Sequence, residues 1–359
     1  MSRLRMAVIG VGHLGKEHAR ILSDFPDVEL VGVADVNVEQ AQTVARRCRT
    51  RAFADYWPLL NLVDAAVIAV PTSYHHAIGC EFLKRQIPLL IEKPLALSVE
   101  QSGELLELSR AREVLLQVGH IERFNPAFQE LAAHPLRPKF IACERLGPFS
   151  GRSTDIGVVL DLMIHDLDLV LTLVQAPVLT VDALGVSVFG GHEDVANARL
   201  VFTDGCVATL TASRASTTAV RRMNVWAPEG YAGIDLAQRS LTFVQPSEEL
   251  RRLRASPATQ ERSLIKKELA PRYLQALHLE RKEGDQLTAE LREFVDSVNG
   301  STKPRVSGAE GHGAIVLATR ILESIRSHDW NGVGGGPVGP FELPAPLGDL
   351  FNTAQSEAA

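Results

Sequence analysis

Short apolar runs alternate with amphipathic stretches along the first third of the chain. Five runs are mostly apolar at successive positions, at residues 5–9, 28–34, 65–70, 89–91 and 114–118. Strands that helices cover on both faces have this continuous pattern, whereas half-exposed strands alternate. The regular succession of such strands and helical segments predicts an α/β fold with a parallel, doubly wound sheet.

The pattern changes after about Gly119. Helices are expected at 126–133 and 157–174, and a strand at 139–144. Strand-like runs at 180–189, 196–202, 206–213 and 222–226 are joined by short turns such as Thr-Asp-Gly, which favours an antiparallel meander. Amphipathic helices are expected at 289–298 and 313–325, whereas 247–283 carries both charge signs and gives no assignment. These features predict a second, α+β domain with a mainly antiparallel open sheet.

The length of 359 residues exceeds what one core usually organises, which favours two domains. We expect a dinucleotide-binding Rossmann domain at 1–121 and an α+β domain for substrate binding and oligomerisation at 122–330. Residues 331–359 begin with a Gly- and Pro-rich run, so a flexible tail is expected there.

Composition and charge narrow the class of protein. Hydrophobic residues make up 45% and charged residues 22% of the chain, as in ordinary globular proteins. The net charge of −6 gives no general attraction to nucleic acid or anionic lipid. The amino terminus lacks a signal-peptide pattern, and the apolar stretch 157–174 carries four ionisable residues, so we expect a cytoplasmic protein without membrane spans. The four cysteines show no Cys-x-x-Cys spacing, so reduced thiols and no metal are expected.

A Gly-x-Gly-x-x-Gly motif follows the first strand and opens a helical segment at 13–22. Its glycines are Gly10, Gly12 and Gly15, with His13 and Leu14 between them. Such a turn lets helix amides hold a pyrophosphate. Asp35 ends the second strand, where a carboxylate accepts hydrogen bonds from a ribose diol and repels the extra phosphate of NADP, so NAD is expected. The alternative is a glycine turn with a capped helix and a surface Asp35.

Candidate catalytic groups lie in two separate segments. Lys93 follows the strand 89–91, at the carboxyl end where open α/β sheets bind ligands, although a solvated lysine is the simpler interpretation. Asp161 and His165 are four apart in an expected helix and would share a face, either as catalytic groups or as a buried cap and histidine. A histidine near neutrality suits proton removal from an alcohol. Asp168 is expected to brace this helix.

Taken together, the Gly-Val-Gly-His-Leu-Gly, Glu-Lys-Pro and Asp-x-x-x-His-x-x-Asp motifs resemble those of the Gfo/Idh/MocA oxidoreductases over residues 4–328. The resemblance implies that Lys93, Asp161 and His165 meet around the substrate carbinol. It also implies that a second set of residues lies beside NAD, namely Pro71, Thr72, His75, Glu92, Lys93 and Pro94. Met163 departs from the family, which commonly has glycine there, so the pocket shape is expected to differ.

Two segments, 119–126 and 147–161, are similar to those of bacterial UDP-N-acetylglucosamine 3-dehydrogenases within that family. This similarity implies oxidation to a 3-keto sugar for amination in lipid A synthesis, with an aminotransferase acting next. Arg123, Asn125 and Arg152 are candidate substrate contacts, since an arginine fork suits diphosphate oxygens. Surface salt bridges for Arg145 and Arg152 are an equal alternative, as is a helix cap for Asn125.

Other functions stay open at the level of sequence. One is another sugar or inositol dehydrogenase of the same family, or a redox-neutral glycosidase that uses NAD. A different class is a non-catalytic NAD-binding sensor, which would not need Lys93, Asp161 and His165 together. The family resemblance and an exposed sheet face in the second domain imply a homodimer or homotetramer.

Overall fold

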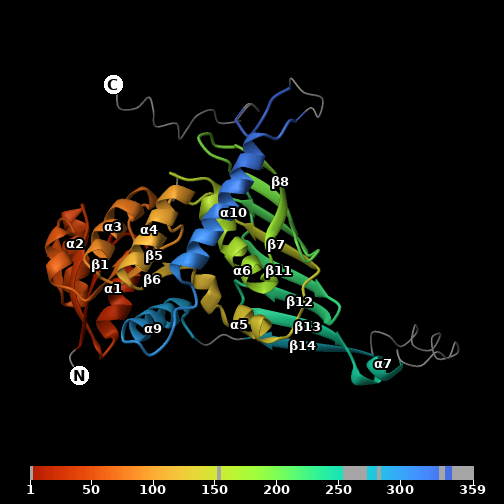
Figure 1. Cartoon of the computed structure of the whole chain (residues 1–359), viewed down its shortest axis with the longest axis horizontal. Helices are drawn as coiled ribbons and strands as arrows, with labels where there is room; N and C mark the ends of the chain where they lie inside the picture. Colours follow the sequence, from red (N-terminus) through yellow and green to blue (C-terminus); the bar gives the residue numbers. More distant parts are fainter. Residues whose placement is uncertain (1–2, 152–154, 254–272, 281–283, 331–335, 342–359) are drawn as a thin grey trace. The chain divides into compact units, whose positions relative to one another are not determined.

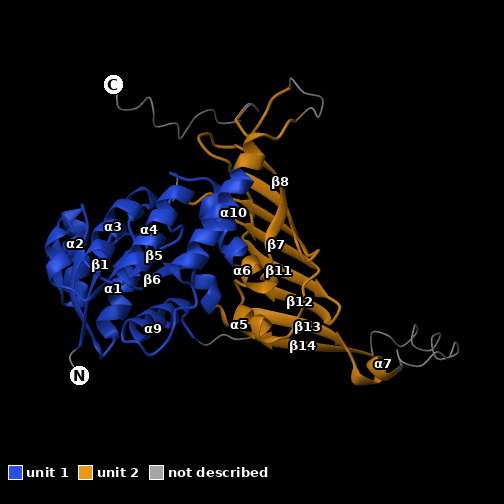
Figure 2. Ribbon diagram, in the orientation of Figure 1, with its two compact units in different colours: residues 1–124, 153–168, 284–322 blue, residues 125–152, 169–283, 323–359 orange. Residues whose placement is uncertain are grey.

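The fold is known from a computed structural model, which describes residues 3–151, 155–253, 273–280, 284–330 and 336–341. Most of the expected tail, 331–359, lies outside the described residues. The chain divides into two compact units (Figure 2): unit 1 comprises 1–124, 153–168 and 284–322, and unit 2 comprises 125–152, 169–283 and 323–359.

Unit 1 contains a parallel sheet of six strands. They are β1 (Leu4–Ile9), β2 (Val28–Ala34), β3 (Arg51–Phe53), β4 (Ala65–Ile68), β5 (Leu89–Glu92) and β6 (Leu116–Gly119). The strand order is β3-β2-β1-β4-β5-β6, and every neighbouring pair is parallel. The expected doubly wound sheet is confirmed, and its order reverses between β1 and β4, where such sheets bind ligands.

Helices follow the strands of unit 1 in turn (Figure 1). They are α1 (Gly15–Asp24), α2 (Val38–Cys48), α3 (His75–Lys84) and α4 (Val99–Arg112), with 3-10 turns η1 (Trp57–Asn61), η2 (Thr72–Tyr74) and η3 (Ile121–Phe124). The side chains of Asn37 and Ser98 accept hydrogen bonds from the first turns of α2 and α4, so each helix begins at a cap that the sequence supplies.

A late helix completes the core of this unit. The side chains of Leu291, Phe294 and Val295 on α9 (Gln286–Val298) are buried in one cluster with residues of β1, α1 and α2. The first part of α10 (Gly308–Arg326) belongs to the same unit. The compact units therefore differ from the contiguous division at residue 121, because an apolar helix face far along the chain packs on the first sheet.

Unit 2 is built on an eight-stranded sheet in the order β14-β13-β12-β11-β7-β10-β9-β8. Its strands are β7 (Phe140–Leu146), β8 (Val178–Val186), β9 (Val195–Phe202), β10 (Val207–Ser213), β11 (Val220–Ala227), β12 (Gly230–Asp235), β13 (Ser240–Pro246) and β14 (Leu274–Glu280). The pair β7–β10 is parallel and the other pairs are antiparallel, so the mainly antiparallel sheet is confirmed. The expected meander is interrupted, because β7 lies between β10 and β11.

One face of this sheet is covered and the other carries exposed aromatic side chains. Helix α5 (Pro126–Ala133) packs on β12 and β13 (Figure 1), and the short helix α7 (Glu248–Leu253) follows β13. On β7 and β11, burial alternates, with Ile141 and Val225 fully buried and Phe140 and Trp226 exposed. The rings of Phe140 and Trp226 stack with centroids 5.0 Å apart. Across the described residues, no helix combines the length and apolar character that a membrane span requires.

Candidate active site

The glycine loop leaves room on one side only. Gly10 has a φ of +82°, and a Cβ there would lie 2.7 Å from the carbonyl oxygen of Ala69. A Cβ on Gly15 would overlap the carbonyl oxygen of Gly10, whereas a Cβ on Gly12 would meet no protein atom within 4 Å. Gly12, His13 and Leu14 are exposed at the start of α1. The loop thus packs tightly on the sheet and stays open above Gly12, which fits the pyrophosphate of a dinucleotide.

Asp35 holds this loop in place. One carboxylate oxygen accepts a hydrogen bond of 2.8 Å from the amide of Val11, and the other accepts one of 2.9 Å from the amide of Asn37. A carboxylate has about four acceptor positions. Asp35 can therefore support the glycine loop and also accept hydrogen bonds from a ribose.

Lys93 and Asp161 meet although they are far apart in the sequence. The Nζ of Lys93 donates to the carbonyl oxygen of Asp161 at 2.7 Å and to its Oδ1 at 3.0 Å. Their side chains are 14% and 20% exposed, so the pair is largely shielded from solvent but still reachable. The ammonium group thus has a fixed position at the carboxyl end of β5.

A buried hydrogen-bonded pair, Glu92 and His18, supports the backbone at Lys93. The Oε1 of Glu92 is 2.7 Å from the Nε2 of His18 on α1, and its Oε2 accepts from the amide of Lys93 at 3.2 Å. Burial opposes ionisation of Glu92, but the hydrogen bond from His18 and the charges of His18 and Lys93 keep its pKa below the ordinary value. Glu92 therefore anchors the backbone that carries Lys93.

His75 ties together two loops at the cofactor end of the sheet. Its Nδ1 lies 2.9 Å from the carbonyl oxygen of Pro94 and its Nε2 lies 2.9 Å from that of Val70. Burial lowers the pKa of His75, although both carbonyl contacts act against this. Pro71 caps the turn η2 and Thr72 is buried in it. These contacts give His75 a positioning role for the segments that the sequence assigns to the cofactor.

The helix that carries Asp161 and His165 is not a continuous α-helix. Residues Val159–Met163 form a π-helical turn, η4, and α6 (Ile164–Val174) begins after it. The expected helical stretch at 157–174 is confirmed in outline, with this π-turn inside it, so Asp161 lies in the π-turn and His165 in the first turn of α6. Met163, where the family commonly has glycine, is fully buried in this turn. π-turns of this kind recur at functional sites.

His120 and its neighbours were missed by reasoning from the sequence. His120 follows β6 and is 1% exposed, and its ring meets that of His165 edge-on with centroids 6.3 Å apart. Burial and the charge of Lys93 lower the pKa of His120 to about 3, so the ring is neutral. His120 could have been identified from the sequence, because it follows a parallel strand at the carboxyl end where such sheets bind ligands, as Lys93 does. The burial of His18 on α1 and of Glu290 on α9 could not be predicted in this way, because neither residue follows a strand.

Arg123 and Asp168 form a buried pair. An Nη of Arg123 lies 3.7 Å from Oδ1 of Asp168, and another donates to the carbonyl oxygen of Arg305 at 2.7 Å. Burial raises the pKa of Asp168 to about 7, and Glu310 adds to this, while Arg123 opposes it. Asp168 thus contacts Arg123, and the guanidinium of Arg123 is held by protein atoms of Asp168 and Arg305.

The other candidate substrate contacts lie in unit 2 or outside the described residues. Asn125 is fully buried; its Oδ1 accepts from the amide of Ala127 at 3.1 Å and its Nδ2 donates to the carbonyl oxygen of Leu236 at 2.9 Å. It is the N-cap of α5. Arg145 is 4% exposed, so the alternative of a surface salt bridge is wrong for it. Arg152 lies outside the described residues.

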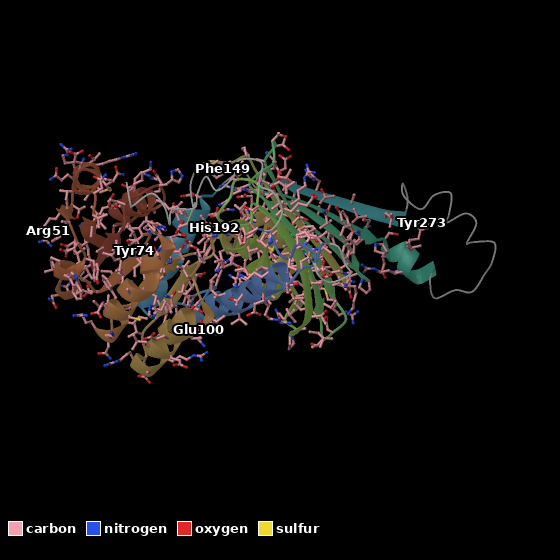
Figure 3. The ribbon with its side chains drawn as sticks, turned by 90° about the horizontal axis from the view of Figure 1, so that it is seen from above. Arg51, Tyr74, Glu100, Phe149, His192 and Tyr273 are labelled. Atoms are coloured by element: carbon pink, nitrogen blue, oxygen red, sulfur yellow. The ribbon has the colours of Figure 1, made fainter. Side chains whose placement is uncertain are left out.

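The segment before Arg152 is anchored through Phe149. Phe149 and His192 lie in loops of unit 2, after β7 and between β8 and β9 (Figure 3). The Phe149 ring meets that of Phe189 with centroids 4.8 Å apart, and the guanidinium of Arg214 lies 5.8 Å from its centre. Asp194 pairs with Arg214 at 2.5 Å. The loop after β7 is thus packed, through Phe149, against Phe189 and Arg214.

Two stretches of the chain match protein-family models. Residues 4–120 match the model described as "Oxidoreductase family, NAD-binding Rossmann fold". Residues 138–232 match "GFO/IDH/MocA C-terminal domain".

The chain is also similar to individual curated proteins and to solved structures. UDP-N-acetylglucosamine 3-dehydrogenase of Acidithiobacillus ferrooxidans is 34% identical over 91% of this chain and 99% of its own length. A solved structure of that enzyme superposes with a TM-score of 0.80 at 33% identity, covering 90% of this chain and 98% of the other. scyllo-Inositol 2-dehydrogenase (NAD(+)) of Bacillus subtilis is 29% identical over 60% of this chain and 68% of its own. Levoglucosan dehydrogenase in complex with NADH, at 17% identity and a TM-score of 0.75, shares the fold over 90% of this chain and 97% of its own.

Proposed function

The chain belongs to the Gfo/Idh/MocA family of oxidoreductases and is an NAD-dependent sugar dehydrogenase, and we propose that its substrate is UDP-N-acetylglucosamine, oxidised at the 3-hydroxyl. The proposal rests on the relative of that activity, which matches nearly the whole chain in sequence and in structure. The 3-keto product would then be the substrate of an aminotransferase that supplies an amino sugar to lipid A synthesis.

The observation that carries the proposed chemistry is the contact between Lys93 and Asp161. The ammonium group, 3.0 Å from the carboxylate, is a fixed hydrogen-bond donor for the oxygen of a carbinol. His165, four residues after Asp161, is the proposed base that takes the hydroxyl proton. Lys93 stabilises the negative charge that develops on the oxygen as the proton leaves.

The cofactor supplies the oxidising power. NAD, when bound, would supply the acceptor for the hydride, so both electrons of the sugar C–H bond would be accounted for. The glycine loop, Asp35 and the segments braced by His75 are the residues that we assign to holding it. Glu92 would hold the backbone of Lys93 in place when that cofactor binds, because its Oε2 accepts from the Lys93 amide.

The test is formation of NADH, followed by absorbance, on mixing the protein with NAD and UDP-N-acetylglucosamine. Glutamate and a partner aminotransferase would be present to draw an unfavourable keto product forward. Free N-acetylglucosamine, inositol and UDP-glucose are the comparison substrates. NADH formation that requires both the UDP group and the N-acetyl group is expected. Turnover of a free polyol would instead return the assignment to another dehydrogenase of the family.

Replacing Lys93 tests the assignment of residues. In Lys93→Ala, kcat is expected to fall by at least about 100-fold, because the fixed charge beside the carbinol oxygen is lost. NADH should still bind, since the glycine loop and Asp35 keep their contacts in this variant; a fluorescence titration with NADH measures this. Near-normal turnover in this variant would contradict the role proposed for Lys93.

A further inference from the structure

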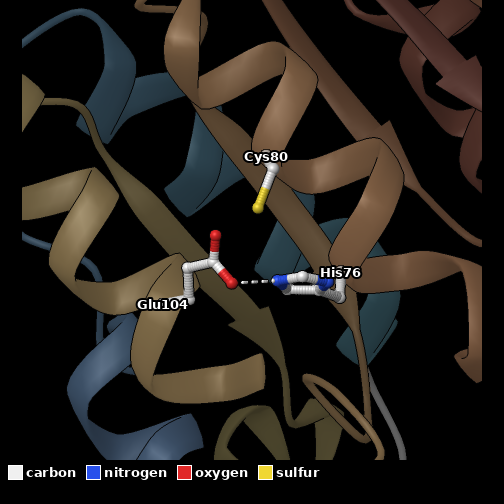
Figure 4. A group of neighbouring side chains, drawn as sticks. All are labelled: His76, Cys80 and Glu104. Carbon is white, nitrogen blue, oxygen red and sulfur yellow. Dashed lines mark hydrogen bonds and ion pairs between the residues drawn. The ribbon is translucent and has the colours of Figure 1, made fainter. Parts of the chain in front are cut away.

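Three side chains with different donor atoms gather on the helices α3 and α4 of unit 1. They are His76 and Cys80, four residues apart on α3, and Glu104 on α4 (Figure 4). Their ligand-forming atoms all lie within 4.8 Å of one another. The Nε2 of His76 and the Oε2 of Glu104 are 2.8 Å apart.

This geometry is close to what a tetrahedral transition-metal ion needs. With Zn–N of about 2.0 Å and Zn–S of about 2.3 Å, ligand atoms around zinc lie roughly 3.3–3.8 Å apart. The His76–Glu104 separation of 2.8 Å is slightly shorter than this and no separation exceeds 4.8 Å, so side-chain rotation could bring the three atoms to that spacing. An exposed His–Glu ion pair alone gives no reason for a thiol to point at it, as Figure 4 shows for Cys80.

Burial differs among the three in a way that suits a bound ion. Cys80 is 5% exposed, whereas the side chains of His76 and Glu104 are 25% and 63% exposed. An ion could therefore enter past Glu104 and bind the sulfur from the solvent side. Burial, and then the charge of Glu104, raise the pKa of the Cys80 thiol, so a metal would displace its proton on binding.

We propose that His76, Cys80 and Glu104 form a divalent transition-metal site that accepts Zn²⁺ and links α3 to α4, with solvent at the fourth position. Mixed N, S and O donors are typical of zinc ligands. The site is separate from the proposed catalytic groups and does not depend on the identity of the sugar. It departs from the expectation of no metal, because two of its ligands share a helix and the third comes from another, a relation that cysteine spacing does not reveal.

Cobalt substitution tests the proposal on the untagged full chain after dialysis against a chelator. Addition of Co²⁺ is expected to produce a thiolate-to-cobalt charge-transfer band with a stoichiometry of one, and Zn²⁺ should abolish it. Cys80→Ser should remove the band. Cys48→Ser is the matched control, since Cys48 is a buried thiol on α2 of the same unit and should leave the band unchanged.

Glu104→Gln is the second variant, because Glu104 is exposed and its substitution should leave the stability of the fold unchanged. It should weaken Co²⁺ binding by at least about 10-fold, the smaller loss found even for outer-shell partners of metal ligands. Far-UV circular dichroism and NADH binding establish that each variant is folded. Absence of the band in the native protein, its persistence in Cys80→Ser, or unchanged affinity in Glu104→Gln would overturn the site.

Discussion

At the scale of single residues, His120 combines deep burial with unused hydrogen-bonding capacity. Neither ring nitrogen has a hydrogen-bond partner among the described residues, and a buried polar group in that state costs about 1–3 kcal/mol. A neutral ring beside His165 could hydrogen-bond a sugar hydroxyl. We therefore expect His120 to bind the substrate at some expense of stability.

The variant His120→Phe keeps a ring of similar shape and removes both nitrogens. Its melting temperature is expected to equal or exceed that of the native protein, while kcat/KM falls by about 10-fold or more. Thermal unfolding and steady-state kinetics measure the two effects. If kcat/KM were unchanged, His120 would serve only to pack against His165.

Asp168 predicts a dependence of stability on pH. In the unfolded chain its carboxyl group ionises near 3.8, whereas in the folded protein its pKa is about 7. The unfolded state thus releases its proton first, so this group's contribution to stability is present below about pH 4 and is lost as the pH rises through about 7.

In Asp168→Asn this loss cannot occur, because an amide does not ionise. The melting temperature of the variant relative to the native protein should rise between pH 5 and pH 8, by roughly 2–4 °C for each kcal/mol of difference. Melting curves at several pH values measure it. Two curves that run parallel across this range would show that Asp168 ionises normally in the fold.

Sequence reasoning anticipated some residues and missed others for physical reasons. The position of Lys93 could be predicted, because it follows a parallel strand and ligands bind at the carboxyl ends of such strands. The contact between Lys93 and Asp161 was expected from the family resemblance. Asn125 illustrates the opposite case, since a side chain before proline can cap a helix or bind a ligand and only the fold decides. His18 could not be assigned, because its partner Glu92 is distant in the sequence.

At the scale of elements, the glycine loop offers a matched pair of substitutions. In Gly12→Ala the new methyl group meets no protein atom, so the fold should be retained. NADH affinity should fall, because the methyl group occupies the space above Gly12 that we assign to the pyrophosphate.

In Gly15→Ala the methyl group overlaps the Gly10 carbonyl oxygen, so the melting temperature should fall by several degrees. Thermal unfolding and NADH titration separate the two; equal behaviour in both assays would contradict this picture of the loop.

Some element boundaries were predicted closely, and others were not. The strand β2 and the helix α5 begin and end where expected, whereas β3 is only three residues long and was not anticipated. The π-turn before α6 was hidden as well, because hydrophobic periodicity averages over several turns and does not register one added residue.

At the scale of the whole molecule, the face of the unit 2 sheet that carries Phe140 and Trp226 is a candidate interface. Exposed Phe140 and Trp226 stack on neighbouring strands, and aromatic patches on a sheet face are typical of an interface. We propose that a second copy of the chain covers this face, in a dimer or in each half of a tetramer.

Trp226→Glu should therefore shift the protein toward the monomer in size-exclusion chromatography with light scattering. Trp57→Glu is the control, because Trp57 is also exposed but lies in unit 1. A monomeric native protein, or an equal shift in both variants, would argue against this interface.

The packing of α9 into the first unit affects how the protein is made. During synthesis, the parallel sheet emerges early, but the helix that buries its residues in the shared core emerges only after most of unit 2, residues 125–152 and 169–283. Until then, we expect the apolar side chains that pack against Leu291 and Phe294 in the folded protein to lack these partners. The amino-terminal unit therefore cannot finish folding first, as leading domains commonly do, and its maturation is bound to completion of the whole polypeptide.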